Sequence, residues 1–202
     1  MKIINLTENS KTYTSNVYLV SGTYNKLDDV NALVDVGRDL SILEMVLEAA
    51  TGVGKKRLDA VVLTHSHFDH SAMLSHIITV FKPVVYAYSN AMTGIDKILK
   101  NGEMIKLGDR NFEVIYMPGH SSDSICLHCR IDGVLFSGDS PILVHSTNGN
   151  YEEGFISAME RICRLDVRTI YFGHGKPLHD NCNEKLRKSL SNIRTAMNLK
   201  VL

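Results

Sequence analysis

A six-residue stretch, His65–His70 (HSHFDH), constrains this chain more than any other feature. It holds three histidines and one aspartate, and it directly follows the apolar run AVVL, which predicts a buried strand. Imidazole nitrogens suit zinc and iron, and a carboxylate is a further ligand that these ions accept. Residues i and i+2 of an extended chain point the same way, so His65 and His67 can bind one ion together. Asp69 and His70 follow a turn of the chain and can face a second ion. A polar surface loop is the alternative, but it does not explain so many ligands in six positions.

Length and composition are typical of a globular protein. The chain has 202 residues, of which 44% are hydrophobic and 22% are charged, and we expect one domain over residues 1–202. Its 22 basic residues equal its 22 acidic ones, so a nucleic-acid or membrane surface is not expected and a small-molecule substrate is. The oligomeric state stays open.

The sequence also carries signals about compartment. The N-terminus lacks the apolar core and cleavage site of a signal peptide, and no apolar stretch approaches the roughly 20 residues of a membrane span. Four cysteines are too few for a disulfide scaffold in a chain of this length. We therefore expect a cytoplasmic protein.

Strand-like apolar runs alternate with helical patterns along the chain, which suggests sheets packed together with helices outside. Strands are predicted at 16–20, 32–36, 60–64, 84–87, 104–107, 112–117, 124–130, 134–137 and 169–172. Helices are predicted at 41–50, 71–80, 93–100, 152–165 and 181–199.

Three more candidate ligands each follow a predicted strand. They are His120 in the segment PGH, Asp139 in SGD and His174 in GHG. Glycine beside the ligand lets the backbone turn sharply, and a loop at a strand end presents the side chain at the sheet edge. Each segment alone is a weak signal, but in this order after the hexapeptide they predict a larger metal site.

With these motifs, the chain resembles the metallo-β-lactamase superfamily and, within it, the glyoxalase II-like hydrolases. The resemblance rests on SNVYLV near the start, LVDVG at 33–37, the H-x-H-x-D-H motif, PGH, SGD and GHG, and it covers nearly the whole chain. It implies an α/β fold, a four-layer αββα sandwich. It also implies a first metal held by His65, His67 and His120, a second held by Asp69, His70 and His174, and Asp139 bridging both.

The same resemblance implies a dinuclear hydrolase in which a metal-bridging hydroxide attacks a small thioester, ester or lactone. Two ions about 3.5–4 Å apart can activate water at neutral pH and polarise the attacked carbonyl. We expect two divalent ions, zinc first, with iron or manganese as alternatives. Asp69 is the candidate catalytic residue because it can also orient the hydroxide and take up a proton. Asp35 is a candidate partner of a ligand imidazole, and His145 is a candidate for the substrate cleft.

Several points leave the substrate open. The hexapeptide is followed by Ser71 and Ala72, and PGH by SSDS, where the family often has other residues. Only 28 residues follow His174 (202−174), so we expect no C-terminal helical domain of the kind that binds glutathione in glyoxalase II. The alternatives are a mononuclear iron persulfide dioxygenase and a phosphodiesterase or nuclease of the same superfamily. Di-iron oxygen reductases fit less well, because they typically have Glu where this chain has His67.

Overall fold

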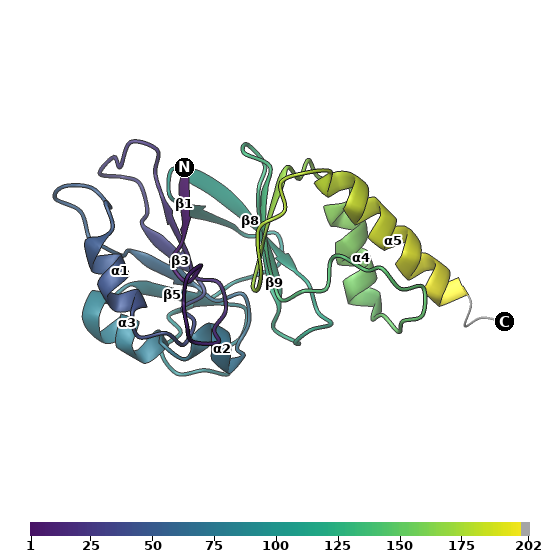
Figure 1. Cartoon of the computed structure of the whole chain (residues 1–202), viewed down its shortest axis with the longest axis horizontal. Coiled ribbons are helices and arrows are strands. Elements are labelled where there is room, and N and C mark those ends of the chain that lie inside the picture. Colours follow the sequence, from purple (N-terminus) through teal and green to yellow (C-terminus); the bar gives the residue numbers. More distant parts are fainter. Residues whose placement is uncertain (199–202) are drawn as a thin grey trace.

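Two β-sheets face each other in this protein, and helices cover the outer face of each sheet (Figure 1). The computed structural model describes residues 1–198. The first sheet has the strand order β1-β2-β3-β4-β5-β6, and the second has the order β11-β10-β9-β8-β7. The strands of the first sheet are β1 (Lys2–Asn5), β2 (Tyr18–Ser21), β3 (Ala32–Val34), β4 (Ala60–Val62), β5 (Val84–Ala87) and β6 (Lys97–Ile98). Those of the second are β7 (Met104–Leu107), β8 (Arg110–Tyr116), β9 (Ile125–Cys129), β10 (Val134–Gly138) and β11 (Thr169–Phe172).

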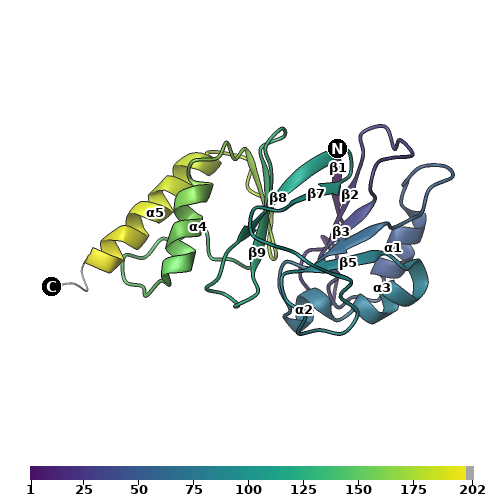
Figure 2. The ribbon, with the colours of Figure 1, turned by 180° about the vertical axis from the view of Figure 1, so that it is seen from behind.

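The helices divide between the two outer faces. Figures 1 and 2 show α1 and α3 outside the first sheet and α4 and α5 outside the second. Their bounds are α1 (Ile42–Glu48), α2 (Phe68–Ser71), α3 (Leu74–Phe81), α4 (Glu153–Ile162) and α5 (Cys182–Asn198). The order helix, sheet, sheet, helix is the predicted four-layer αββα sandwich.

Three apolar layers hold these four layers together. Tyr18 and Val20 of β2 point between the sheets, where they join Phe112 and Phe136, whereas Leu19 points outward. Both faces of the central strands are buried, so these strands read as nearly continuous apolar runs. The two outer layers lie under the helices. The first contains Leu19, Leu33, Ile42, Val61 and Ile77, and the second contains Ile115, Leu135, Phe155, Met159, Leu186 and Ile193.

Strand direction decides where the loops gather. Strands β3, β4 and β5 run parallel, and β10 runs parallel to β11. Parallel neighbours end at the same edge of a sheet, and functional loops gather at such an edge. The segments that follow β3, β4, β10 and β11 include Asp35, the hexapeptide, Asp139 and His174, respectively.

Most predicted elements are present, and three differ. The helix predicted at 71–80 is two helices, α2 and α3, because α2 begins within the hexapeptide. The helix predicted at 93–100 is wrong: Gly94 has φ +88, and the chain then pairs with β5 as β6. A helix there is broken by the left-handed glycine, and the Asp96 carboxylate accepts a hydrogen bond from Val85 N. Strand β1 was not predicted. Leu199, the last residue of the predicted final helix, lies outside the described residues.

Within residues 1–198, no helix combines the length and apolar character that a membrane crossing requires.

Candidate metal centre

The seven predicted ligands lie together at one edge of the sandwich, although they come from four separate loops. Their side chains form three overlapping groups, in each of which the possible ligand atoms lie within 4.8 Å of one another. The groups are His65, His67 and His120; His65, His70 and Asp139; and Asp69, His70 and His174. Two of these groups are the two metal sets implied by the sequence.

The first group is a cluster of three imidazoles. His120 Nε2 lies 2.9 Å from His67 Nδ1, and the ring centroids of His65 lie 4.6 Å from His67 and 4.8 Å from His120. His65 is buried, whereas His67 and His120 are exposed. Three imidazoles that converge in this way match the ligand set of many zinc sites.

The group of Asp69, His70 and His174 adds a carboxylate, and Asp139 lies between this group and the three imidazoles. His174 Nε2 lies 3.0 Å from Asp69 Oδ2. Asp139 Oδ2 lies 3.3 Å from His70 Nε2, 3.4 Å from His174 Nε2 and 3.7 Å from His120 Nε2. One carboxylate oxygen therefore approaches imidazoles of both groups, as the proposed bridging role requires.

Two buried imidazole nitrogens support metal binding. His65 Nε2 and His70 Nε2 are both buried and have no hydrogen-bond partner among residues 1–198. A buried polar atom without a partner costs about 1–3 kcal/mol, so native proteins seldom leave one without a reason. Bound metal ions would take the lone pair of each nitrogen, and the donor set suits zinc or iron.

Asp35 orients these two imidazoles through a connected set of hydrogen bonds. Its Oδ2 accepts a hydrogen bond from the Thr64 hydroxyl at 2.8 Å and lies 2.8 Å from His70 Nδ1. Because the Thr64 hydroxyl hydrogen points to Asp35, its oxygen is left to accept from His65 Nδ1, 3.2 Å away. With metals bound, both imidazoles would then carry hydrogen on Nδ1 and present Nε2 to the ions. Asp35 thus contacts the imidazole of a candidate ligand, His70, and sequence reasoning missed Thr64.

The surroundings shift the pKa values of these groups in the metal-free protein. Burial lowers the pKa of His65 to about 4, so its imidazole is neutral near pH 7. Burial also opposes the charging of His70, but the carboxylates of Asp35 and Asp139 outweigh burial and raise its pKa to about 10. Burial alone would raise the pKa of Asp139, but His70 and His174 hold it below its ordinary value. Asp139 is therefore an anion ready to bind a cation.

The loop that carries His174 is fixed by the N-terminal part of the chain. The side-chain nitrogen Nδ2 of Asn16 donates hydrogen bonds to the carbonyls of Phe172 and Gly175 at 2.9 and 2.8 Å. A side chain at Gly173 would overlap Asp139 and come within 2.7 Å of His70 Cε1, so only glycine fits between these groups. Sequence reasoning placed Asn16 in a strand and missed this role. Its position before an apolar run gave no signal for a contact more than 150 residues away.

Two exposed aromatic side chains border the centre. Phe68, inside the hexapeptide, is 70% exposed, and the guanidinium of Arg38 lies 5.7 Å from the centre of its ring. Tyr13 is 72% exposed and stacks on the imidazole of His174, with ring centroids 5.5 Å apart. Large exposed apolar groups beside a site suit contact with an apolar part of a ligand.

His145 is not brought together with the ligands. Its side chain is exposed, it belongs to none of the three groups, and its carbonyl accepts a hydrogen bond from Asn192 on α5 at 3.3 Å. Its role in a substrate cleft stays a prediction.

Curated relatives of this chain include hydrolases of thioesters. It is 25% identical over 164 residues to an atrochrysone carboxyl ACP thioesterase of Aspergillus fumigatus, covering 78% of this chain and 51% of that one. It is 32% identical over 205 residues to the acyl-coenzyme A thioesterase MBLAC2 of Gallus gallus, covering 79% and 72%. Over 88 residues it is 36% identical to a hydroxyacylglutathione hydrolase of Francisella tularensis, covering 43% and 35%. The chain thus spans about half of the first relative and about a third of the third.

A solved structure and a family profile agree with this picture. The structure of ETHE1 from Myxococcus xanthus matches with a TM-score of 0.67 at 19% identity, covering 98% of this chain and 91% of that one, which shows the shared fold. The profile of the metallo-beta-lactamase superfamily matches residues 11–174, a range that contains all seven candidate ligands. The chain belongs to the metallo-beta-lactamase superfamily.

Proposed function

We propose that this protein is a dinuclear metal-dependent hydrolase of thioesters, with small esters and lactones as neighbouring substrate classes. The observation that carries the proposal is that the Asp139 carboxylate lies close to imidazoles of both ligand groups. Thioesters come first among the substrates because two of the relatives above are named thioesterases.

Each ligand group has a defined part in this proposal. His65, His67 and His120 hold one ion, Asp69, His70 and His174 hold the other, and Asp139 binds both. Bound there, two divalent ions would lower the pKa of water enough to give a nucleophile at neutral pH and would polarise the thioester carbonyl. We take zinc as the first choice, with iron and manganese as alternatives.

Asp69 is the proposed catalytic residue. Its Oδ2 lies 3.0 Å from His174 Nε2, and its backbone carbonyl accepts a hydrogen bond from Ser15 N at 3.1 Å. Both the side chain and the backbone of Asp69 are therefore held in place. A carboxylate that is held at a metal centre and only partly buried can orient the attacking water and accept its proton. The departing thiolate needs little help from an acid, because a thiol has a far lower pKa than an alcohol.

The exposed side of the centre sets the direction of substrate approach. His67 and His120 are exposed, while His65 and His70 lie buried behind them. The acyl group of the substrate would therefore meet Phe68 and Tyr13, the two aromatic side chains at the border.

The test is hydrolysis by the purified protein after zinc, manganese or iron is restored. The panel contains acyl thioesters, a lactone, a simple ester and a phosphodiester, and the metal content is measured by elemental analysis. We expect two ions per chain, thioester cleavage, and a loss of at least about a hundredfold in His67→Ala and Asp139→Ala. His76→Ala, which changes an exposed histidine of α3, is the matched control and should keep full activity. One iron per chain with oxygen consumption on a persulfide would contradict the proposal, as would thioester cleavage that survives both ligand substitutions.

A further inference from the structure

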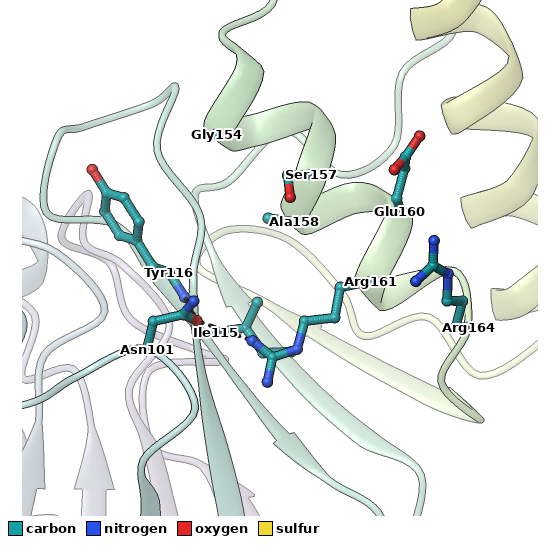
Figure 3. A pocket seen from close by; sticks show the side chains of 9 residues that line it. All are labelled: Asn101, Ile115, Tyr116, Gly154, Ser157, Ala158, Glu160, Arg161 and Arg164. Atoms are coloured by element: carbon teal, nitrogen blue, oxygen red, sulfur yellow. Dashed lines mark hydrogen bonds between the residues drawn. The ribbon is translucent and has the colours of Figure 1, made fainter.

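A second site lies outside the metal centre, in a hollow of about 530 Å³ between β8 and α4 (Figure 3). We propose that this hollow binds the phosphate end of a phosphopantetheine thiol carrier, as found in coenzyme A and in the arm of acyl carrier proteins. The inference rests on the proposed thioesterase function. The residues around the hollow include Asn101, Tyr116, Gly154, Ser157, Arg161 and Arg164.

Several hydrogen-bond donors at the hollow have no partner within residues 1–198. Asn101 Oδ1 accepts from Tyr116 N at 3.0 Å and from Arg161 Nη1 at 3.1 Å, so the amide nitrogen of Asn101 keeps both its hydrogens for a ligand. The Ser157 hydroxyl and the Arg164 guanidinium likewise form no hydrogen bond or ion pair with the described residues. Figure 3 shows Asn101 and Arg161 next to each other, one on each side of the hollow. Such a set of free donors suits an anion.

One cationic side chain at the hollow, that of Arg164, has no ion-pair partner among the described residues. Arg161 Nη2 forms an ion pair with Glu113 at 2.5 Å, and Glu160 pairs with Arg194 at 2.7 Å. Both nearby carboxylates are thereby neutralised, and Arg164 remains without an ion-pair partner among the described residues. A guanidinium with exposed donors binds phosphate in a two-pronged geometry that lysine cannot provide. Phosphate is therefore the anion that this hollow fits best.

The hollow begins beside the loop that carries His120. A side chain added at Gly154 would come within 3.0 Å of Pro118 Cγ, and one added at Gly119 within 3.3 Å of Phe155, so the first turn of α4 packs on this loop. From Gly154 to Arg161 the helix advances about 10 Å. The cationic end of the hollow is thus well separated from the metal centre.

This separation selects the kind of ligand. A small phosphate ester would need its phosphate at the metal centre, where its reactive bond lies. A phosphopantetheine thioester has its phosphate at one end and its acyl–sulfur bond at the other, with a flexible amide chain between them. That chain can follow α4 from Arg164 to Pro118 and deliver the thioester carbonyl beside His120.

The first experiment compares two substrates with the same acyl group. One is the acyl-coenzyme A, and the other is the N-acetylcysteamine thioester, which has no phosphate. In Arg164→Gln we expect KM for acyl-coenzyme A to rise about tenfold with kcat unchanged, since one charged hydrogen-bonding group is removed. The N-acetylcysteamine thioester should show no change. Arg57→Gln, an exposed arginine near α1, is the control and should leave both substrates unaffected.

The second experiment measures binding without turnover. Calorimetry on metal-free protein uses coenzyme A, 4′-phosphopantetheine, pantetheine and a holo-acyl carrier protein. Binding of the phosphorylated ligands that weakens about tenfold in Arg164→Gln, with pantetheine unaffected, supports the subsite. Stronger binding of the carrier protein than of coenzyme A would identify it as the source of the arm. If a single-stranded RNA binds and coenzyme A does not, the subsite proposal is overturned.

The two proposals fail in different ways. A KM for acyl-coenzyme A that is equal in Arg164→Gln and the parent protein overturns the subsite and leaves the hydrolase standing. Coenzyme A binding that depends on Arg164, without cleavage of any thioester in the panel, overturns the hydrolase and leaves the subsite standing.

Discussion

Replacing Asp35 by asparagine should reverse the proton positions on two proposed ligands at once. Asp35 is 2% exposed and has φ +60, a conformation that asparagine adopts nearly as readily as aspartate. The amide of the Asp35→Asn variant can keep its carbonyl oxygen toward Thr64 N, which donates to Asp35 Oδ1 at 2.7 Å in the parent protein. The NH2 group of this amide then replaces Oδ2 and faces Thr64 Oγ1 and His70 Nδ1. The change is therefore small in shape and large in chemistry.

The NH2 group can only donate, so each partner must accept. His70 then carries its hydrogen on Nε2, the atom proposed to bind metal. The Thr64 hydroxyl, which now accepts from the amide, turns its own hydrogen toward His65 Nδ1, and this moves the His65 hydrogen to Nε2 as well. Loss of such a supporting hydrogen bond typically costs a metal site about 10- to 100-fold in affinity, which is about 1.4–2.7 kcal/mol. One imidazole of each proposed metal set is affected, so both ions should bind more weakly by this amount.

Two measurements check the expectation. Competition with a chromophoric chelator gives the zinc affinity, and nitrogen-15 NMR of His65, whose imidazole is neutral near pH 7 in the metal-free protein, reports which of its ring nitrogens carries the hydrogen. Asp96→Asn is the matched control, because Asp96 also accepts a backbone hydrogen bond, from Val85 N at 2.8 Å, outside the ligand groups. Zinc affinity within twofold of the parent protein, with His65 Nε2 still unprotonated in the Asp35→Asn variant, would refute the reasoning.

Three further predictions follow from particular contacts. Gly173→Ala should lower metal content and activity, because the new methyl group meets Asp139 and His70; Gly54→Ala, where no atom lies within 4 Å of the added group, should keep both despite its strained backbone. Phe155→Ala should lower the free energy of unfolding by about 3–5 kcal/mol in urea titrations, because Phe155 on α4 is fully buried in the apolar layer beneath that helix, and a loss below about 1 kcal/mol would contradict this packing. The pKa of His70 is raised from 6.5 to about 10 in the folded metal-free protein, so protonation stabilises the fold fully below pH 6.5, and this stabilisation is lost as the pH rises through 10. The urea midpoint of the metal-free protein should fall across this range, whereas that of His70→Gln should stay level.

The alternation of strand-like and helical runs predicted packed sheets with helices outside, and the family resemblance implied the four-layer sandwich. The strands at 84–87, 104–107 and 169–172 were predicted with their observed bounds. The error at 93–100 has a tertiary cause. Its apolar spacing resembles a helix, yet the unpaired edge of β5 offers hydrogen bonds to β6, and Leu99 N donates to Ala87 O at 2.8 Å. A pairing partner that lies next to the segment only in the fold is invisible to local periodicity.

The candidate ligands could be identified from the sequence, whereas the residues that hold them in place could not, because their roles depend on contacts formed only in the fold. A histidine or aspartate after an apolar strand is conspicuous by residue type. Thr64 and Asn16 are common polar residues, and their roles depend on contacts with Asp35 and with the His174 loop. These contacts join segments that are far apart along the chain, so they become visible only when the sheets are assembled.

The packing of the two sheets leaves the centre with one buried side and one side exposed to solvent. His65 and His70 are buried and tied to Asp35 behind them, whereas His67 and His120 are exposed and lack such a buried carboxylate among the described residues. In the proposed metal centre, the buried pair would fix where the metals sit, since its rings cannot turn without breaking the hydrogen bonds that lead to Asp35. The exposed pair borders the solvent and the loop that packs on α4. A substrate of the proposed hydrolase would therefore approach from this exposed side, and the hollow between β8 and α4 begins beside the loop that carries His120.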